Sequence, residues 1–474
     1  MKIAYYYLFL FCLLVLSCGP PPVEVDLLIK SGNIIDVVTG KMIEGKAIAI
    51  NRDTVIAVID ENDLGQYHAK KVVDAKDKFI IPGLWDMHVH FGGGDTLIQE
   101  NKNLLPLYIV NGITTVRDCA ADISPSVLQW RSEIEQGKLF GPSIFTSGPK
   151  IEGDKSVWVG DLEVDTKEEA TEALDLLQRM KVDFVKVTDN TLEPDLYLTI
   201  LTEARRRGLK TSAHVPFALT LKQVSASGLG TIEHGSYLLK AGSTREQEIT
   251  DKLASRKLTN REAMPLILES FDNEKAMAAF SEVSRNGTAV VPTLGISHTL
   301  AYLDQDDHHD DEYLDYIGSG LRKTYEGRVI RAAKDDAAAV ELRHRVYEKT
   351  KSIIPLVLKS GMKIIAGTDA GYLNSFVYPG LALHQELELF TEAGLTPTEA
   401  LQTATMNGPS FMGKESKFGT IERGKTANLV ILNNDPLKNI RNTRDIDAVV
   451  LKGKIFGRQS LDSILMEVKR LAGH

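Results

Sequence analysis

The hydrophobic and polar positions divide the chain into a strand-rich beginning, a long alternating middle and a strand-rich end. In the beginning, short apolar runs between glycines predict strands at 25–30, 33–38, 47–51, 55–58 and 71–74. A similar pattern returns at 427–432 and 448–451, with a turn predicted at Lys452-Gly453-Lys454. Because both ends share this pattern, we expect a small β-sandwich domain built from 24–80 and 413–458, followed by a C-terminal helix at 459–474.

The middle of the chain, residues 81–412, alternates apolar strand-like runs with amphipathic helices such as those at 167–180 and 195–207. The apolar runs lie at 80–90, 114–118, 143–147, 182–188, 210–214, 231–234, 288–292 and 363–369. This alternation predicts the α/β class and a parallel (β/α)8 TIM barrel, with a doubly wound sheet as the structural alternative. Residues 236–284 and 296–345 exceed a minimal barrel, so we expect extended loops or helical lids there, above the C-terminal ends of the strands.

The N-terminus has the features of an export signal. Lys2 precedes an uncharged apolar run from Ile3 to Leu16, which is short for a membrane span. The run ends in Val15-Leu16-Ser17-Cys18, which resembles a bacterial lipobox, and prolines follow within the tether 18–23. We therefore expect a signal peptide at 1–17, a lipid on Cys18, and anchoring to a membrane of the bacterial cell envelope, facing the periplasm. The alternatives are an ordinary cleaved signal or an N-terminal anchor helix.

Composition narrows the class of partner. Hydrophobic residues at 43% and charged residues at 25% are values of a globular protein. A formal net charge of −9 argues against a nucleic-acid partner but is compatible with a small-molecule substrate. If Cys12 leaves with the signal and Cys18 is lipidated, only Cys119 remains, which excludes a disulfide framework and a cysteine metal site from the mature chain.

Candidate metal-binding side chains lie at the ends of predicted strands. His88 and His90 are two residues apart, so on a strand they point to the same side, where neutral imidazoles can share a divalent metal. By itself this spacing is also that of two polar residues on a half-exposed strand. Four further residues end predicted strands of the barrel: Lys186, His214, His234 and Asp369. Barrel active sites lie at this end of the strands, so we expect the six residues to form one site.

This set resembles that of the amidohydrolase superfamily, and more closely its imidazolonepropionase-like and Xaa-Pro dipeptidase-like branch. The segments that carry the closer match are Ile232-Glu233-His234-Gly235, 366–371, 383–387 and 424–430. The resemblance extends over essentially the whole mature chain. It implies that CO2 converts Lys186 into a carbamate that bridges two divalent metal ions, with zinc preferred over manganese or cobalt.

The same resemblance assigns roles to the other residues. His88, His90 and Asp369 would hold one metal, and His214 and His234 would hold the other. Asp369 would accept a proton from the attacking water and pass it to the leaving nitrogen. The implied reaction is hydrolysis of an amide or peptide C–N bond, for example in a Xaa-Pro dipeptide or an N-acyl amino acid.

Three other functions remain open at this point. One is a single-metal hydrolase or deaminase that acts on a heterocycle, although Lys186 argues against the imidazolone hydrolase itself. Another is lactonase or phosphotriesterase activity, because the same hydroxide attacks carbonyl and phosphoryl centres. The third is a lipoprotein that binds a ligand without chemistry.

Several further residues are weaker candidates. Tyr237 follows His234 by three residues, where it either reaches a substrate carboxylate or packs within its loop. His384 either contacts the substrate or supports the site, and Asp86 is expected to make a buried structural hydrogen bond. Lys150, Lys155 and Trp158 lie in a loop that could line a substrate pocket, with none preferred. We interpret 304–315, which contains His308-His309, as a solvated acidic loop.

Overall fold

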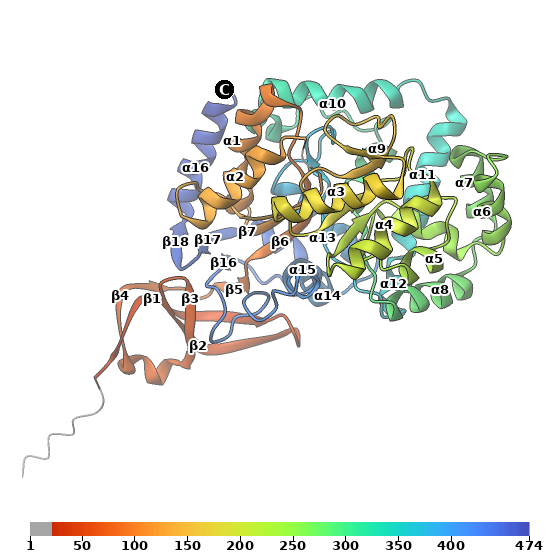
Figure 1. Cartoon of the computed structure of the whole chain (residues 1–474). Helices are drawn as coiled ribbons and strands as arrows, with labels where there is room; N and C mark the ends of the chain where they lie inside the picture. Colours follow the sequence, from red (N-terminus) through yellow and green to blue (C-terminus); the bar gives the residue numbers. More distant parts are fainter. Residues whose placement is uncertain (1–20, 121, 474) are drawn as a thin grey trace, which may run out of the picture.

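The computed structural model describes residues 21–120 and 122–473. The predicted signal peptide, Cys18 and the first half of the tether lie outside the described residues. A strand-rich part, formed by segments near both ends of the chain, adjoins a larger part whose short strands are covered by helices (Figure 1). Within the described part of the chain, no helix is both long enough and apolar enough to cross a membrane.

The strand-rich part is built from both ends of the chain, as predicted. Its strands are β1 (Val23–Asp36), β2 (Lys41–Asn51), β3 (Thr54–Asp60), β4 (Tyr67–Asp74), β5 (Phe79–Pro82), β16 (Leu429–Leu432), β17 (Ile446–Leu451) and β18 (Lys454–Gly457). They join in the order β18-β17-β16-β5-β1-β2-β3, with β4 paired to β1. The described strands thus form one eight-stranded sheet rather than the two separately bonded sheets expected of a sandwich. Leu27 and Ile48 pack in one apolar cluster of this sheet, and Val25 and Ala47 pack in another.

Strand β1 corrects the prediction of two separate strands at 25–30 and 33–38. It runs continuously through Gly32, where its pairing with β2 shifts register and Ser31 adopts a φ of 62°. The bulge lets the first half of β1 pair with β4 and the second half pair with β5. The predicted break in the pattern is therefore a bend within one strand.

The larger part contains two parallel sheets. The first has the order β15-β6-β7-β8 and the second the order β10-β9-β11-β12-β13-β14. Their strands are β6 (Leu84–His90), β7 (Ile113–Asp118), β8 (Ser143–Thr146), β9 (Ile151–Gly153), β10 (Leu162–Val164), β11 (Val185–Val187), β12 (Thr211–Ala213), β13 (Thr231–Glu233), β14 (Ala289–Val291) and β15 (Ala370–Gly371). Backbone hydrogen bonds from Asp183 to Thr146 and from Met87 to Ala366, of 2.9 and 3.0 Å, continue the pairing beyond these strands. The α/β class is confirmed, and this arrangement is consistent with a TIM-barrel-like domain.

The last predicted strand, 363–369, differs from the structure. Ile364 makes an isolated parallel bridge to Val290, and the strand β15 begins only at Ala370. Asp369 adopts a φ of 64°, which is incompatible with an extended strand. The carboxylate is therefore presented from a sharp bend immediately before β15.

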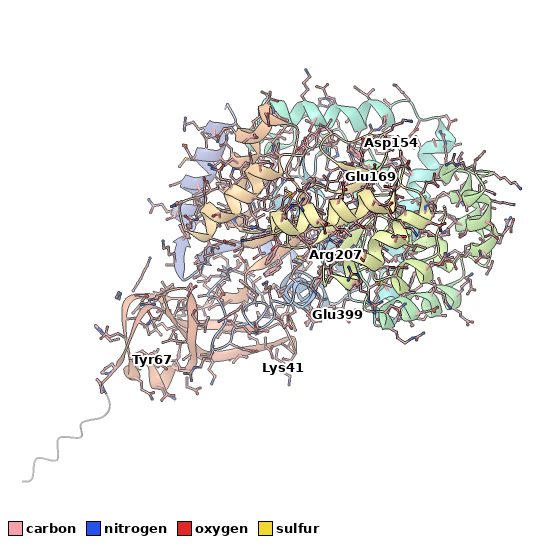
Figure 2. The ribbon with its side chains drawn as sticks, viewed as in Figure 1. Lys41, Tyr67, Asp154, Glu169, Arg207 and Glu399 are labelled. Atoms are coloured by element: carbon pink, nitrogen blue, oxygen red, sulfur yellow. The ribbon has the colours of Figure 1, made fainter. Side chains whose placement is uncertain are left out.

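Helices cover the larger part, and their ends follow local sequence rules. They include α1 (Ile98–Val110), α2 (Ser124–Glu135), α3 (Lys167–Met180), α4 (Pro194–Arg206), α5 (Leu221–Ala226), α8 (Asn273–Arg285), α12 (Ile354–Lys359), α13 (Leu381–Glu392), α14 (Pro397–Thr405) and α15 (Asn407–Met412). In α3, Thr166 and Glu169 form a capping box, and Lys181 ends the helix in a left-handed conformation. Glu169 and Arg207 lie on the helical part, whereas Lys41 and Tyr67 lie on the strand-rich part (Figure 2).

The two segments beyond a minimal barrel are largely helical. The first contains η3 (Gly235–Gly242), α6 (Glu246–Ala254) and α7 (Asn260–Glu269), and the second contains α9 (Leu294–Ala301), η4 (Glu312–Tyr316), α10 (Ser319–Ala332) and most of α11 (Ala337–Ser352). The C-terminal helix α16 (Arg458–Leu471) packs against α1, close to its predicted range.

Candidate metal centre

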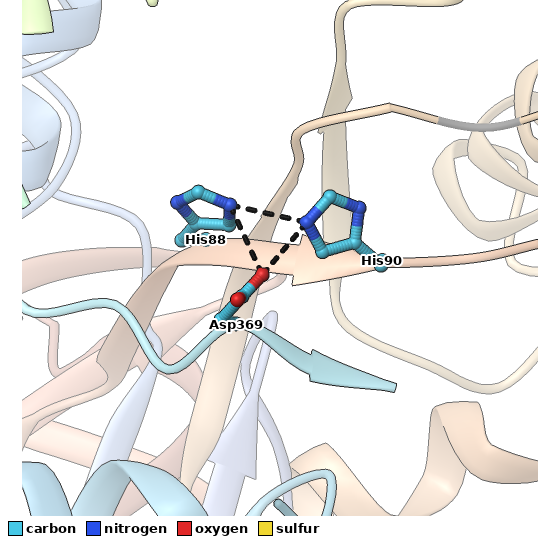
Figure 3. Close-up of side chains that lie close together, drawn as sticks. All are labelled: His88, His90 and Asp369. Atoms are coloured by element: carbon cyan, nitrogen blue, oxygen red, sulfur yellow. Dashed lines mark hydrogen bonds and ion pairs between the residues drawn. The ribbon is translucent and has the colours of Figure 1, made fainter. Parts of the chain in front are cut away.

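Three side chains converge at the end of β6, and we call them the β6 group: His88, His90 and Asp369. The Nε2 atoms of His88 and His90 lie 3.1 Å apart. Asp369 Oδ1 lies 3.3 Å from His88 Nε2 and 2.8 Å from His90 Nε2 (Figure 3). Two nitrogens bound to one tetrahedral zinc ion are separated by about 3.3 Å, so the three atoms are spaced as ligands of one ion would be.

A second pair of imidazoles lies beside this group, and we call it the β12–β13 pair: His214 and His234. They directly follow β12 and β13, and their Nε2 atoms are 3.1 Å apart. The rings of His234 and His88 have centroids 5.1 Å apart, so the pair adjoins the β6 group. The structure therefore brings together five of the six predicted ligands as two neighbouring sets.

Burial keeps these imidazoles neutral. It lowers the pKa of His88 and of His234 to about 3, and it lowers the pKa of His214 well below its usual value. Burial opposes the charge on Asp369, but the imidazoles of His88 and His90 beside it hold its pKa well below the usual value. Neutral imidazoles and an ionised carboxylate are the protonation states that metal binding requires.

Lys186, the sixth predicted residue, lies in the middle of β11 and lines the same cavity as His90, His214, His234 and Asp369. It is 1% exposed, and its Nζ has no hydrogen-bond partner within residues 21–120 and 122–473. Burial lowers the pKa of this amine. A buried, unpartnered amine beside five metal-binding side chains is costly unless it binds something further, so these residues fit a metal centre that includes Lys186.

A buried ion pair fixes His88 from behind. Glu233 Oε2 accepts a hydrogen bond from His88 Nδ1 at 2.7 Å, which leaves the lone pair of Nε2 facing Asp369 and His90. Glu233 Oε1 pairs with Arg117 at 2.7 Å, and both side chains are fully buried. Arg117 and Glu233 support the candidate site but were not among the residues predicted for it. The available signal was a charged residue in each of two buried strands.

A second cluster of possible ligands is formed by His88, Cys119 and Glu233. Burial raises the pKa of the Cys119 thiol to about 12, which disfavours the thiolate that a metal would need. Glu233 pairs with Arg117 at 2.7 Å. This cluster is therefore less suited to a metal ion than the β6 group.

Asp86 makes the buried structural hydrogen bonds predicted for it. Its Oδ2 accepts from the Thr368 hydroxyl at 2.7 Å, and its Oδ1 accepts from the backbone N–H groups of Thr368 and His88 at 3.1 and 3.2 Å. These contacts tie β6 to the bend that carries Asp369. His234 also has a positive φ, of 71°, so strained backbone concentrates at two of the candidate ligands.

The candidate ligands open into a cavity of about 790 Å³, part of which is open solvent. Lys150 and Trp158 line it, with Lys150 Nζ 5.2 Å from the centre of the Trp158 ring, whereas Lys155 is exposed and pairs with Asp154. The structure thus selects two of the three residues that the sequence left equivalent. Arg328 from α10 also lines the cavity, and sequence reasoning gave no sign of it.

Two weaker candidates, Tyr237 and His384, have partners within the protein, which favours the supporting role of the two that the sequence left open for each. The Tyr237 hydroxyl donates to Asp189 at 3.2 Å, and its ring stacks on His214 with centroids 5.7 Å apart, so it supports an imidazole rather than facing the cavity. His384 is fully buried on α13, where its ring nitrogens contact the Thr443 hydroxyl at 2.9 Å and the Asn111 carbonyl at 3.0 Å. It therefore joins a helix to neighbouring segments and is not placed to touch a substrate.

The two histidines of the acidic loop 304–315 pair with aspartates of the same loop. His308 lies 2.9 Å from Asp311, and His309 pairs with Asp307 at the surface. No group of three metal-binding side chains was found there among the residues described.

A model of the amidohydrolase family matches residues 79–456, so the chain belongs to that family. It is a hydrolase that acts on carbon–nitrogen bonds. The sequence is 22% identical over 480 residues to ochratoxinase of Aspergillus niger, covering 88% of this chain and 84% of that protein.

Solved structures show the same fold. A Xaa-Pro dipeptidase with bound methionine in the active site has a TM-score of 0.67 at 21% identity, covering 91% of this chain and 99% of that one. Bottromycin amidohydrolase has a TM-score of 0.70 at 19% identity, covering 94% of this chain and 90% of that one. The resemblance noted in the sequence is thus confirmed at the level of the family.

Proposed function

We propose that this protein is a binuclear metal-dependent hydrolase that cleaves an amide or peptide C–N bond of a small molecule, at the mouth of a closed (β/α)8 barrel. The observation that carries the proposal is the placement of the unpartnered amine of Lys186 in one cavity with His214, His234 and Asp369. Membership of the amidohydrolase family and the amide-cleaving relatives support the type of bond.

Lys186 would complete the site by reacting with CO2. The neutral Nζ attacks the carbon of CO2, a new N–C bond forms, and one proton is released, which leaves a carbamate with two oxygens. Those oxygens would give the β12–β13 pair a third ligand and the β6 group a further one. His88, His90 and Asp369 would hold one divalent ion, with zinc favoured by the nitrogen and oxygen donors.

When bound, two divalent ions make a hydroxide available at neutral pH and polarise the scissile carbonyl. The chain supplies the proton transfer and the orientation. The ionised Asp369 carboxylate accepts the proton of the attacking water and returns it to the leaving nitrogen. Glu233 holds the His88 ring through Nδ1, and Tyr237 packs against His214.

We propose an amide-linked substrate such as a Xaa-Pro dipeptide or an N-acyl amino acid. The Xaa-Pro dipeptidase and ochratoxinase relatives support this choice. Screening dipeptides and N-acyl amino acids with the metal-loaded enzyme should reveal turnover. A panel without turnover would contradict the proposed substrate class.

The test of the metal centre is metal content per chain, measured by mass spectrometry on the full chain purified in detergent with bicarbonate present. We expect about two divalent ions in the natural protein and about one in Lys186→Ala, because the β12–β13 pair then lacks its third ligand. Lys150→Ala is the matched control, since Lys150 lines the same cavity but pairs with Asp161 at 2.8 Å. A content of one ion per chain that does not change in Lys186→Ala would favour a single-metal enzyme acting on a heterocycle.

We further propose that the chain is a lipoprotein of the bacterial cell envelope, anchored through Cys18 and facing the periplasm. The apolar run that ends in Leu16-Ser17-Cys18 supports this location. Radiolabelled fatty acid should be incorporated into the natural chain but not into Cys18→Ser. Equal labelling of Cys12→Ser and the natural chain would show that Cys12 is not the modified residue.

A further inference from the structure

A positively charged side chain from the segment 296–345 lies beside the candidate metal centre. Arg328, on α10, lines the same cavity as His90 and Asp369. Two of its N–H groups have partners: Nε donates to the Leu373 carbonyl at 3.1 Å, and a terminal nitrogen donates to Asn374 Oδ1. A guanidinium has five N–H donors, so three remain for a ligand.

The partners of Arg328 fix it relative to Asp369. Leu373 and Asn374 belong to the short segment that follows Asp369, and the Asn374 amide donates to the main-chain oxygen of Asp369. The guanidinium is therefore anchored to the segment that carries Asp369, the proposed proton donor to the leaving nitrogen. A charged group on the leaving part of a substrate would meet Arg328 there.

The charge of Arg328 is not neutralised by the protein. Both of its hydrogen-bond partners are neutral oxygens, and within the described ranges no carboxylate forms an ion pair with it. The other charged groups at the cavity wall have partners: Lys150 pairs with Asp161 at 2.8 Å, and Asp122 accepts from the N–H groups of Gly93 and Gly94. Arg328 is thus a largely desolvated cation without a directly paired carboxylate, and Asp369 acts on it only through space.

We propose that Arg328 binds a carboxylate on the leaving amine of the substrate, so that the enzyme releases an amino acid with a free α-carboxylate. The fork of the guanidinium matches the two oxygens of a carboxylate, and the neutral partners on its other side fix its orientation. The inference rests on the proposed amide hydrolysis. It restricts the substrates to N-acyl amino acids and to peptides whose C-terminal residue is the one released.

The test compares matched substrates that differ only at this carboxylate. N-acetyl-L-amino acids and glycyl dipeptides are assayed beside their C-terminal amides, with the natural enzyme, Arg328→Met and Arg328→Lys. For the acids, Arg328→Met should lower kcat/KM by roughly 30- to 1000-fold, mainly through KM, and it should leave the amides nearly unchanged. Arg328→Lys should recover part of the loss. Arg331→Met is the control, because Arg331 is exposed on the same helix.

Binding separates failure of this inference from failure of the proposed function. Calorimetry measures L-methionine, L-proline and their amides on the metal-loaded proteins, whose metal content and melting temperature show that each variant is folded. Binding of the acids that depends on Arg328, without hydrolysis of any substrate, would support the carboxylate site and contradict the amidase. An equal loss for acids and amides in Arg328→Met, or no preference for acids in either assay, would overturn the carboxylate site.

Discussion

In the β6 group, three protein side chains already meet around one point, whereas the β12–β13 pair offers two imidazoles. His88, His90 and Asp369 supply the three protein ligands typical of a catalytic zinc ion. His214 and His234 need a further ligand, and the unpartnered amine of Lys186 lines the cavity with them. Histidines near strand ends thus give one set with three candidate ligands and one set that, in our proposal, would need the modified Lys186.

The two sets also differ in what holds their rings. Behind His88 lies Glu233, a carboxylate that only accepts hydrogen bonds and is itself neutralised by Arg117. Behind His234 lies the hydroxyl of Thr293, 2.7 Å from Nδ1, which can donate or accept. The first arrangement fixes the tautomer of the ring and the second does not, so we expect the β6 group to bind its ion more tightly.

The largest effect on kcat should come from Asp369, which belongs to the β6 group and is the proposed acceptor of the proton from the attacking water. Asp369→Asn keeps the shape but removes the charge and the basic oxygen. We expect kcat to fall by roughly 10³- to 10⁴-fold in steady-state assays on the best substrate found. Asp122→Asn is the control, since this carboxylate lines the same cavity and, among the described residues, accepts from the backbone N–H groups of Gly93 and Gly94. Comparable losses in the two variants would remove the special role of Asp369.

The second-largest effect is expected for Glu233, whose carboxylate accepts the hydrogen bond from His88 Nδ1. Glu233→Gln leaves Arg117 buried without a counter-charge, so the free energy of unfolding should fall by about 3–5 kcal/mol. Metal affinity of the tighter site should fall roughly 10- to 100-fold, measured by competition with a chelator.

A double variant separates these two effects. Glu233→Gln combined with Arg117→Met removes both charges, which should restore much of the stability measured by chemical denaturation. It should not restore metal affinity, because the His88 ring still lacks its carboxylate. Recovery of both quantities together would show that Glu233 acts only through the fold.

A smaller effect is expected behind His234. Thr293→Val removes the hydroxyl at Nδ1 while keeping the branched shape in a position whose φ is 48°. We expect metal affinity of the weaker site to fall roughly 10-fold or less, with the free energy of unfolding lower by about 1 kcal/mol. A loss larger than that of Glu233→Gln would reverse the ranking of the two sets.

The sequence could locate several candidate ligands because they lie on a strand or directly after one, and periodicity predicts strands. His88 and His90 share a face of β6, and His214 and His234 directly follow β12 and β13. The bend at Asp369 was missed, because an apolar run ending in Asp does not reveal a positive φ. The pairing of Arg117 with Glu233, and the approach of Arg328 from α10, depend on contacts between segments far apart in the chain. Such contacts leave no local pattern.

The smallest effect on catalysis should come from an imidazole outside both sets. His384→Phe fills the same space but leaves the Thr443 hydroxyl and the Asn111 carbonyl without their buried partner. The free energy of unfolding should fall by about 1–3 kcal/mol, while kcat/KM and metal content should stay within about twofold of the natural values. Because burial already holds the pKa of His384 at about 3, the ring is neutral at physiological pH and no charge is lost. A large rise in KM with unchanged stability would instead mean that His384 contacts the substrate. A comparison limited to the β6 group and the β12–β13 pair would then leave out a third functional imidazole.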